Sequence, residues 1–279
     1  MSMNYSHPLN NILEDDSIQL EQEGSILKIW LNRPASRNAM SLNMVKSIMS
    51  VFKAIADDTS IRAVVFRGHG NHFCSGGDIK DMAGIRAEAM NVGSNKPYID
   101  FNRIFGSMIE LVDQAPQTVV AVLEGAVLGG GFGLACVSDV AIAHADAKFG
   151  LPETGLGILP AQIAPFVVKR VGLTQARRLA LLGGRFNGET ALRVGVVHEV
   201  ADTPMELEQL IQATLELILR TAPLASRATK ALIHRAQNEP LNTLLDDAAV
   251  QFAEAVNSAE GMEGTMAFIQ KRNPNWMDN

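Results

Sequence analysis

The 279-residue sequence has only two cysteines, Cys74 and Cys136, and each lies beside glycine-rich apolar sequence. Two isolated thiols provide neither a disulfide framework nor the ligand spacing of a zinc site. We therefore expect two small buried residues in a reducing compartment, and we expect no bound metal.

Positive charge is also scarce, because 24 Lys and Arg residues stand against 30 Asp and Glu residues. The net charge is −6 and no basic cluster occurs, so we expect no nucleic-acid partner. The start, MSMNYSHPLNN, lacks a basic segment followed by an apolar run. The longest weakly polar run, residues 125–137, is too short to span a bilayer. We expect a cytoplasmic protein with no membrane partner.

The remaining composition is that of an ordinary globular protein, with 47% hydrophobic and 19% charged residues. Strands are predicted at residues 26–31, 62–68, 118–125 and 139–144, with helices after Ser41 and from Pro97 to about Gln114. Beyond residue 173 the pattern is mostly helical, with predicted starts at Thr174, Gly188, Thr203 and Pro223 and one short strand at 196–200. This order predicts an α/β fold with a helical C-terminal region. We place the division near Asp202, which gives regions 1–202 and 203–279.

Two glycine-rich turns share one layout, in which a predicted strand precedes the turn and a helix follows it. The first is FCSGGD, residues 73–78, and the second is LGGGFG, residues 128–133. A missing Cβ lets the backbone approach a ligand closely, and helix N-termini present free N–H groups. One N–H donor from each turn, directed at a single point, would form an oxyanion hole. A single glycine turn is more often a packing point, and the second turn lacks both nucleotide-binding patterns.

Glu153 follows Pro152 in a stretch that otherwise consists of Gly, Leu, Ile and Pro. Apolar surroundings raise the pKa of a carboxyl group, which can then act as a general acid or base. A helix cap and a surface ion pair are the structural alternatives for this residue.

Four segments in order resemble the crotonase, or enoyl-CoA hydratase/isomerase, superfamily: NRPASRNAMS, HFCSGGDIKDM, EGAVLGGGFGLACVSDVAIA and AKFGLPETGLGILP. The resemblance extends from about Ile26 to Trp276. It implies a spiral core of ββα units and a helical C-terminal region used in trimer contacts. It also implies an acyl-CoA thioester substrate and a homotrimer or a dimer of trimers. Coenzyme A would enter as part of the substrate, with no separate cofactor.

The resemblance also assigns roles to residues of this chain. Gly77 and Gly130 would donate their backbone N–H groups to the thioester oxygen, and Glu153 would be the catalytic carboxylate. The implied substrate-binding residues are Asn38, Ala39, Ser75, Asp78, Ile79, Lys80 and Gly133. Arg33, Arg37 and Lys80 could meet the CoA phosphates, although exposed basic residues are more often only solvated. The histidines at 69, 72, 144 and 198 match no catalytic role.

Two departures from the common family pattern point to a branch of the family. Many hydratases have a first catalytic glutamate where this chain has Gly133. The segment after Glu153 is commonly glycine-rich in the family, whereas this chain has ILPAQIAPFVVKR. Both features resemble the branch acting on branched glutaconyl-CoA substrates, namely isohexenylglutaconyl-CoA hydratase of acyclic terpene breakdown and its neighbour methylglutaconyl-CoA hydratase. We expect Gly133 to remove a charge and to leave room for a branch at C3, the alternative being that it eases helix packing.

Three other functions remain open from the sequence. A general enoyl-CoA hydratase would use the same groups. A Δ3,Δ2-enoyl-CoA isomerase would need only one glutamate to move a proton. An RNA-associated binding protein of the family is disfavoured by the net negative charge.

Overall fold

The computed structural model describes residues 8–277, so the first residues used for the cytoplasmic prediction lie outside its described part. A six-stranded sheet forms its centre, in the order β1-β2-β3-β4-β6-β8. Only β1 and β2 are antiparallel, and every other neighbouring pair is parallel. The strands are β1 Ile18–Glu23, β2 Ile26–Leu31, β3 Ala63–Gly68, β4 Thr118–Leu123, β6 Val140–His144 and β8 Glu199–Ala201.

Both faces of this sheet are buried, which explains why its central strands read as nearly continuous apolar runs. Alternate residues of β2 show the division, because Leu27 and Ile29 belong to the larger core and Ile26 belongs to the smaller one. The larger core includes side chains of four helices: α1 (Leu42–Ile55), α3 (Lys96–Asp113), α4 (Gly130–Val137) and α5 (Ala164–Leu182). The smaller core lies under α7 (Pro204–Arg220), which contributes Leu207 and Ile211.

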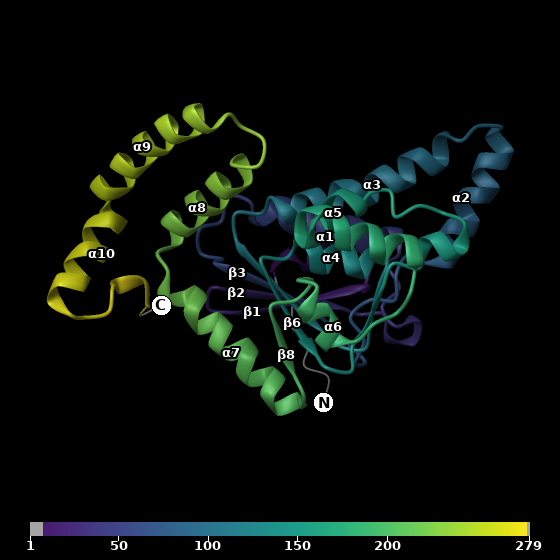
Figure 1. Ribbon diagram of the computed structural model, residues 1–279, viewed down its shortest axis with the longest axis horizontal. Coiled ribbons are helices and arrows are strands. Elements are labelled where there is room, and N and C mark those ends of the chain that lie inside the picture. The colour runs from purple at the N-terminus through teal and green to yellow at the C-terminus, as the bar shows by residue number, and fades with distance from the viewer. Residues whose placement is uncertain (1–7, 278–279) are drawn as a thin grey trace.

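Figure 1 shows α1, α3, α4 and α5 on one side of the sheet and α7 on the other. The helices are α1 Leu42–Ile55, α2 Ile79–Val92, α3 Lys96–Asp113, α4 Gly130–Val137, α5 Ala164–Leu182, α6 Gly188–Arg193, α7 Pro204–Arg220, α8 Pro223–Arg235, α9 Leu241–Asn257 and α10 Ala259–Gln270. The described residues also form short 3₁₀ helices, namely η1 Pro8–Ile12, η2 Pro34–Ser36, η3 Glu153–Leu156 and η4 Asn275–Met277.

A second layer of short extended segments runs beside the main sheet. Its steps are the bridges Met40–Gly77 and Cys74–Val127, the parallel pair β5 Ala126–Leu128 with β7 Lys148–Gly150, and the bridge Phe149–Phe186. Successive turns of the chain thus add one strand to the main sheet, one short segment to this layer, and then helix. The predicted α/β spiral of ββα units is confirmed, and the layer of short segments carries both glycine turns.

Three elements differ from their predictions. The sequence did not signal β1, because this edge strand turns only Ile18 and Leu20 inward and is otherwise polar. The helix predicted from Thr174 is the second half of α5, since Gly172 (φ 72°) interrupts a helix that begins at Ala164. The strand predicted at 196–200 begins only at Glu199 and is β8, because residues 196 and 197 are hydrogen-bonded to the end of α6.

The predicted division at Asp202 falls between β8 and α7. Helix α7 belongs to the smaller core of the sheet, whereas α8, α9 and α10 extend away from it in Figure 1. The two-region description itself stays a prediction. Over residues 8–277, no helix combines the length and the apolar character needed to cross a membrane.

Candidate active site

The two glycine turns are hydrogen-bonded to each other. The N–H of Cys74 donates to the Ala126 carbonyl at 2.8 Å, and the N–H of Leu128 donates to the Cys74 carbonyl at 2.9 Å. Beyond these bonds, a Cβ at Gly129 would lie 3.5 Å from the Cα of Gly76. The segments that end in Gly77 and Gly130 are therefore held side by side, as an oxyanion hole requires.

The N–H of Gly77 is left free by the way its turn pairs with Met40. In this parallel bridge the Met40 N–H donates to the Gly76 carbonyl at 2.8 Å, and the Asp78 N–H donates to the Met40 carbonyl at 3.0 Å. These bonds use the groups on either side of Gly77, and no partner of its own N–H occurs within residues 8–277. Gly77 is also exposed, so a ligand can reach this donor.

Gly130 is the first residue of α4, where the backbone N–H has no acceptor inside the helix. The helix dipole adds positive potential at this end. Each glycine of the triplet has its own neighbour. A Cβ at Gly129 would lie 3.0 Å from Glu153 Oε1, one at Gly130 would lie 3.1 Å from the Phe105 ring, and one at Gly131 would lie 2.6 Å from Cys74 Cβ. The start of α4 can therefore pack closely against Glu153, Phe105 and Cys74 because these three positions lack a side chain. Gly130 itself remains partly exposed.

Glu153 approaches this turn from η3, the short helix that follows β7. Its Oε1 lies beside Gly129, the residue that precedes Gly130 in the chain. Its Oε2 is buried and has no hydrogen-bond partner in the described part of the chain. Burial disfavours the ionised form and raises the pKa of Glu153 above its ordinary value. A half-buried carboxyl group with an unpaired oxygen can accept a proton and return it.

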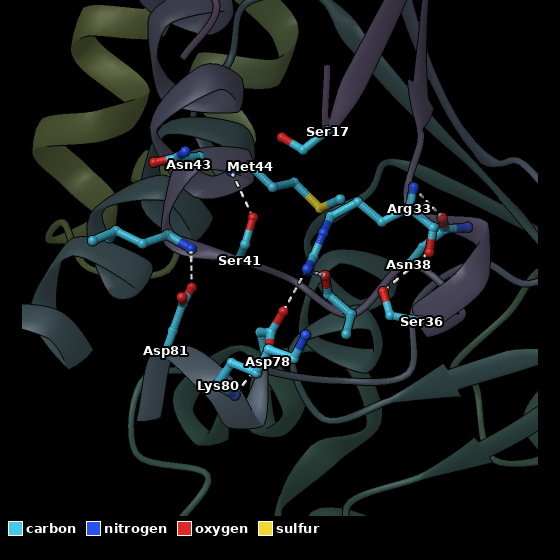
Figure 2. A network of polar contacts seen from close by, with 12 residues as sticks. Ser17, Arg33, Ser36, Asn38, Ser41, Asn43, Met44, Asp78, Lys80 and Asp81 are labelled. Atoms are coloured by element: carbon cyan, nitrogen blue, oxygen red, sulfur yellow. Dashed lines mark hydrogen bonds and ion pairs between the residues drawn. The ribbon is translucent and has the colours of Figure 1, made fainter. Parts of the chain in front are cut away.

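A network of side chains braces the first turn (Figure 2). The Arg33 guanidinium forms an ion pair with Asp78 at 2.6 Å and also donates to the Ala39 carbonyl. Asp78 caps α2 by accepting from the Lys80 N–H at 2.8 Å, and Asp81 of α2 accepts from the Leu42 N–H at the start of α1 at 2.6 Å. The Leu42–Asp81 bond thus joins α1 to α2, and the Arg33–Asp78 pair joins the loop before α1 to the start of α2.

Electrostatics keep this brace charged. Burial opposes ionisation of Asp78, but the hydrogen bonds from the Lys80 N–H and Arg33 outweigh it, so the pKa of this carboxyl lies below its ordinary value. Arg33 is paired with Asp78, and its contact with a CoA phosphate stays a prediction. The sequence did not signal this pair, whose members are 45 residues apart.

The other residues predicted to bind substrate fall into two groups. Asn38 and Ser75 hold the loops together: the Asn38 side chain donates to the His69 and His72 carbonyls, and Ser75 Oγ donates to the Ser36 carbonyl at 2.9 Å. Ile79, 81% exposed, and Lys80 lie open to solvent at the start of α2. The N–H groups of Ala39, Ser75 and Asp78 donate to the Ser36, Arg37 and Met40 carbonyls, so the roles of these residues in substrate binding stay predictions.

Gly133 does not leave open space, which corrects our expectation of room for a branch there. A Cβ at this position would lie 2.4 Å from Ile163 Cγ2 and 3.6 Å from Ile109 Cδ1. The volume beside Gly133 is therefore filled by Ile163, which comes from the ILPAQIAPFVVKR segment and is 2% exposed. The sequence marked both positions as unusual, but the contact between them depends on the fold.

The histidines at 69, 72, 144 and 198, which match no catalytic role, have structural contacts. His72 and His198 each accept a backbone N–H through Nδ1, from Ala126 and Ala141 respectively, and His69 stacks on Trp30. His144 accepts from the Asp146 N–H. Between residues 8 and 277, no group of three or more His, Cys, Asp and Glu side chains is arranged to hold a metal ion.

Known proteins resemble this chain over most of its length. The family model for enoyl-CoA hydratase/isomerase matches residues 21–279. The short-chain-enoyl-CoA hydratase of Clostridium acetobutylicum is 31% identical over 93% of this chain and 97% of its own length. The methylglutaconyl-CoA hydratase of Mus musculus is 28% identical over 92% of this chain and 81% of its own length. The solved structure of AtuE from Pseudomonas aeruginosa has a TM-score of 0.91 and 60% identity, covering 94% of this chain and 99% of that one.

Proposed function

Since the chain belongs to the enoyl-CoA hydratase/isomerase family and is a hydro-lyase, we propose that it hydrates a 3-branched glutaconyl-CoA. Our specific candidate is isohexenylglutaconyl-CoA, converted to the 3-hydroxyglutaryl-CoA derivative in acyclic terpene breakdown. The observation that carries the proposal is that Glu153 reaches the glycine turn, while one turn along α4 the chain has Gly133 covered by the hydrocarbon of Ile163.

The absence of a carboxylate at position 133 matters for a substrate that carries its own distal carboxylate. Two carboxylates about 5 Å apart repel by roughly 3 kcal/mol at an effective dielectric constant near 20. With glycine at position 133, that repulsion is absent on this side of the site. A relative named for methylglutaconyl-CoA supports the same substrate class.

The proposed reaction uses three groups of this chain. The N–H groups of Gly77 and Gly130 bind the thioester oxygen and stabilise the negative charge that develops on it. Glu153 takes a proton from water as the water oxygen bonds to C3, and it then returns a proton to C2. One molecule of water is consumed and no electron is gained or lost. Coenzyme A is part of the substrate, and no separate cofactor takes part.

We also propose that the chain assembles into a homotrimer or a dimer of trimers through its C-terminal helices. Large apolar side chains of α9 and α10 are exposed in the single chain, including Phe252 at 71% and Phe268 at 87%. Copies of the chain covering these helices would remove that surface from water. Light scattering coupled to gel filtration tests this, and a monomer at micromolar concentration would contradict it.

The function is tested by a turnover screen of 3-methylglutaconyl-CoA, its longer branched homologue and crotonyl-CoA. We expect loss of the conjugated-enoyl absorbance, with the highest kcat/KM for the branched diacids. Preference for crotonyl-CoA would overturn the substrate class. Gain of that absorbance from a Δ3-enoyl-CoA would indicate the isomerase instead.

A further inference from the structure

Two adjacent side chains, Gln162 and Ile163, each fill the space that a missing glycine side chain leaves on a neighbouring helix. We call such a space a notch. Gln162 Oε1 lies 1.9 Å from the point where a Cβ at Gly106 of α3 would stand. Ile163 Cγ2 lies 2.4 Å from the corresponding point at Gly133 of α4. Neither helix could carry even a methyl group at its notch without moving this pair, which we call the 162–163 wedge.

The wedge lies beside the catalytic face of α4. Gly130 and Gly133 are three residues apart and so share one side of the helix. The Phe105 ring covers Gly130, and Ile109, four residues further along α3, approaches Gly133. A thioester oxygen held by the Gly130 N–H must therefore place its acyl carbons close to the contact of α3 with α4 that the wedge adjoins.

Hydrogen bonds fix the wedge to α3. Gln162 Nε2 donates to Asn102 Oδ1 at 2.9 Å, and Arg103 donates to Gln162 Oε1 at 3.4 Å. Arg103 is held in turn by an ion pair with Glu110 at 2.8 Å. One end of the wedge is thus bonded to α3 while the other end packs against α4.

We propose that the 162–163 wedge, through Ile163, is a specificity-determining element of this enzyme, a role that rests on the proposed function. By filling the Gly133 notch, Ile163 sets how α4 packs against α3, and hence where the Phe105 ring lies relative to Gly130. The acyl carbons of a thioester held at Gly130 must pass the edge of this ring. A 3-branched acyl group therefore depends on the position of the ring more than the smaller crotonyl group does.

The test is a double-mutant cycle of Ile163→Ala, Gly133→Ala and the double variant. The measured quantity is the ratio of kcat/KM for 3-methylglutaconyl-CoA to that for crotonyl-CoA. We expect Ile163→Ala to lower this ratio about tenfold, within the range for lost apolar contact in a binding pocket. We expect Gly133→Ala to lower it as well, through overpacking against Ile163. The double variant should lose less than the sum of both, because the new methyl group then has room.

Val167→Ala is the matched control. Val167 is equally buried, one turn along α5, and its N–H donates to the Ile163 carbonyl at 2.9 Å. We expect this variant to lose stability while its substrate ratio stays within about twofold of the parent.

An Ile163→Ala variant that folds and keeps the parental ratio would overturn the proposal. If Ile163→Ala does not fold, Ile163→Leu keeps the volume but moves the branch out of the notch, and an unchanged ratio there has the same meaning. A parent enzyme that prefers crotonyl-CoA would refute the proposed function alone, because the cycle measures a change in ratio from either starting point.

Discussion

The two turns that we propose as the source of the N–H donors are stabilised by different forces, although each contains one of the two proposed donor glycines. The first is held by charge and hydrogen bonds, chiefly the Arg33–Asp78 pair, and a Cβ at Gly77 would meet no atom within 4 Å. The second combines backbone hydrogen bonds with close packing, since a Cβ at Gly131 would overlap Cys74. The first turn should therefore tolerate added volume but not lost charge, and the second should behave in the reverse way.

The largest effect is expected for Gly130→Pro. Comparing this variant with Gly130→Ala separates the loss of the N–H donor from the effect of added side-chain volume. Gly130→Pro removes the N–H, and proline is well accommodated at the first position of a helix. We expect kcat/KM to fall by about two to three decades, the usual loss for one oxyanion-hole donor.

Gly130→Ala is the control for that change, because it keeps the N–H and adds a similar contact with Phe105. We expect Gly130→Ala to retain activity within about tenfold of the parent. Equal activity of the proline and alanine variants, both folded by circular dichroism, would remove this donor from the mechanism.

Gly131→Ala should act on stability. Its Cβ would lie 2.6 Å from Cys74 Cβ and 2.8 Å from the Cys74 carbonyl oxygen, and backbone cannot yield as a flexible side chain can. We expect the free energy of unfolding to fall by about 1–3 kcal/mol, measured by urea denaturation. An unchanged midpoint would show that the second turn is not held by contact.

Asp78→Asn tests the brace of the first turn. Asparagine still caps α2, but the charge that holds Arg33 is lost. We expect kcat to fall about tenfold with KM nearly unchanged, because the Gly77 N–H would be less well directed. The control is Asp100→Asn, which breaks the exposed Lys96–Asp100 pair of α3 and should change neither constant. A fall in both variants alike would argue against a specific brace.

The smallest effect is expected for Gly77→Ala. The residue has open space at its Cβ position and a φ outside the left-handed region, and the N–H donor remains. We expect kcat/KM within about threefold of the parent. A loss of two decades would show that the first turn, like the second, depends on a missing side chain.

The sequence was sufficient to locate both turns and Glu153, because strand, glycine turn and helix follow one another locally. It also supported the ββα spiral through the resemblance of four ordered segments. The sequence alone could not predict contacts between segments that are distant along the chain. The Arg33–Asp78 pair and the Ile163–Gly133 contact join residues that only the folded chain brings together.

Glycine was also ambiguous in the sequence, since the residue can mark either open space or a crowded contact. Gly77 has open space, whereas Gly131 and Gly133 are crowded. Our expectation for Gly133 was wrong for this reason, as the neighbour that fills its notch lies 30 residues further along the chain.

The central claim is that Glu153 carries the proton between water and C2, and the pH dependence of hydration by the parent and Glu153→Gln tests it most directly. Glu153 must be ionised to accept a proton, and burial raises its pKa. We therefore predict that kcat/KM of the parent falls as the pH drops through this raised pKa. Glu153→Gln should bind acyl-CoA but hydrate it at least about a hundredfold more slowly, without that acid limb. A variant with parental turnover and the same pH profile would contradict the account.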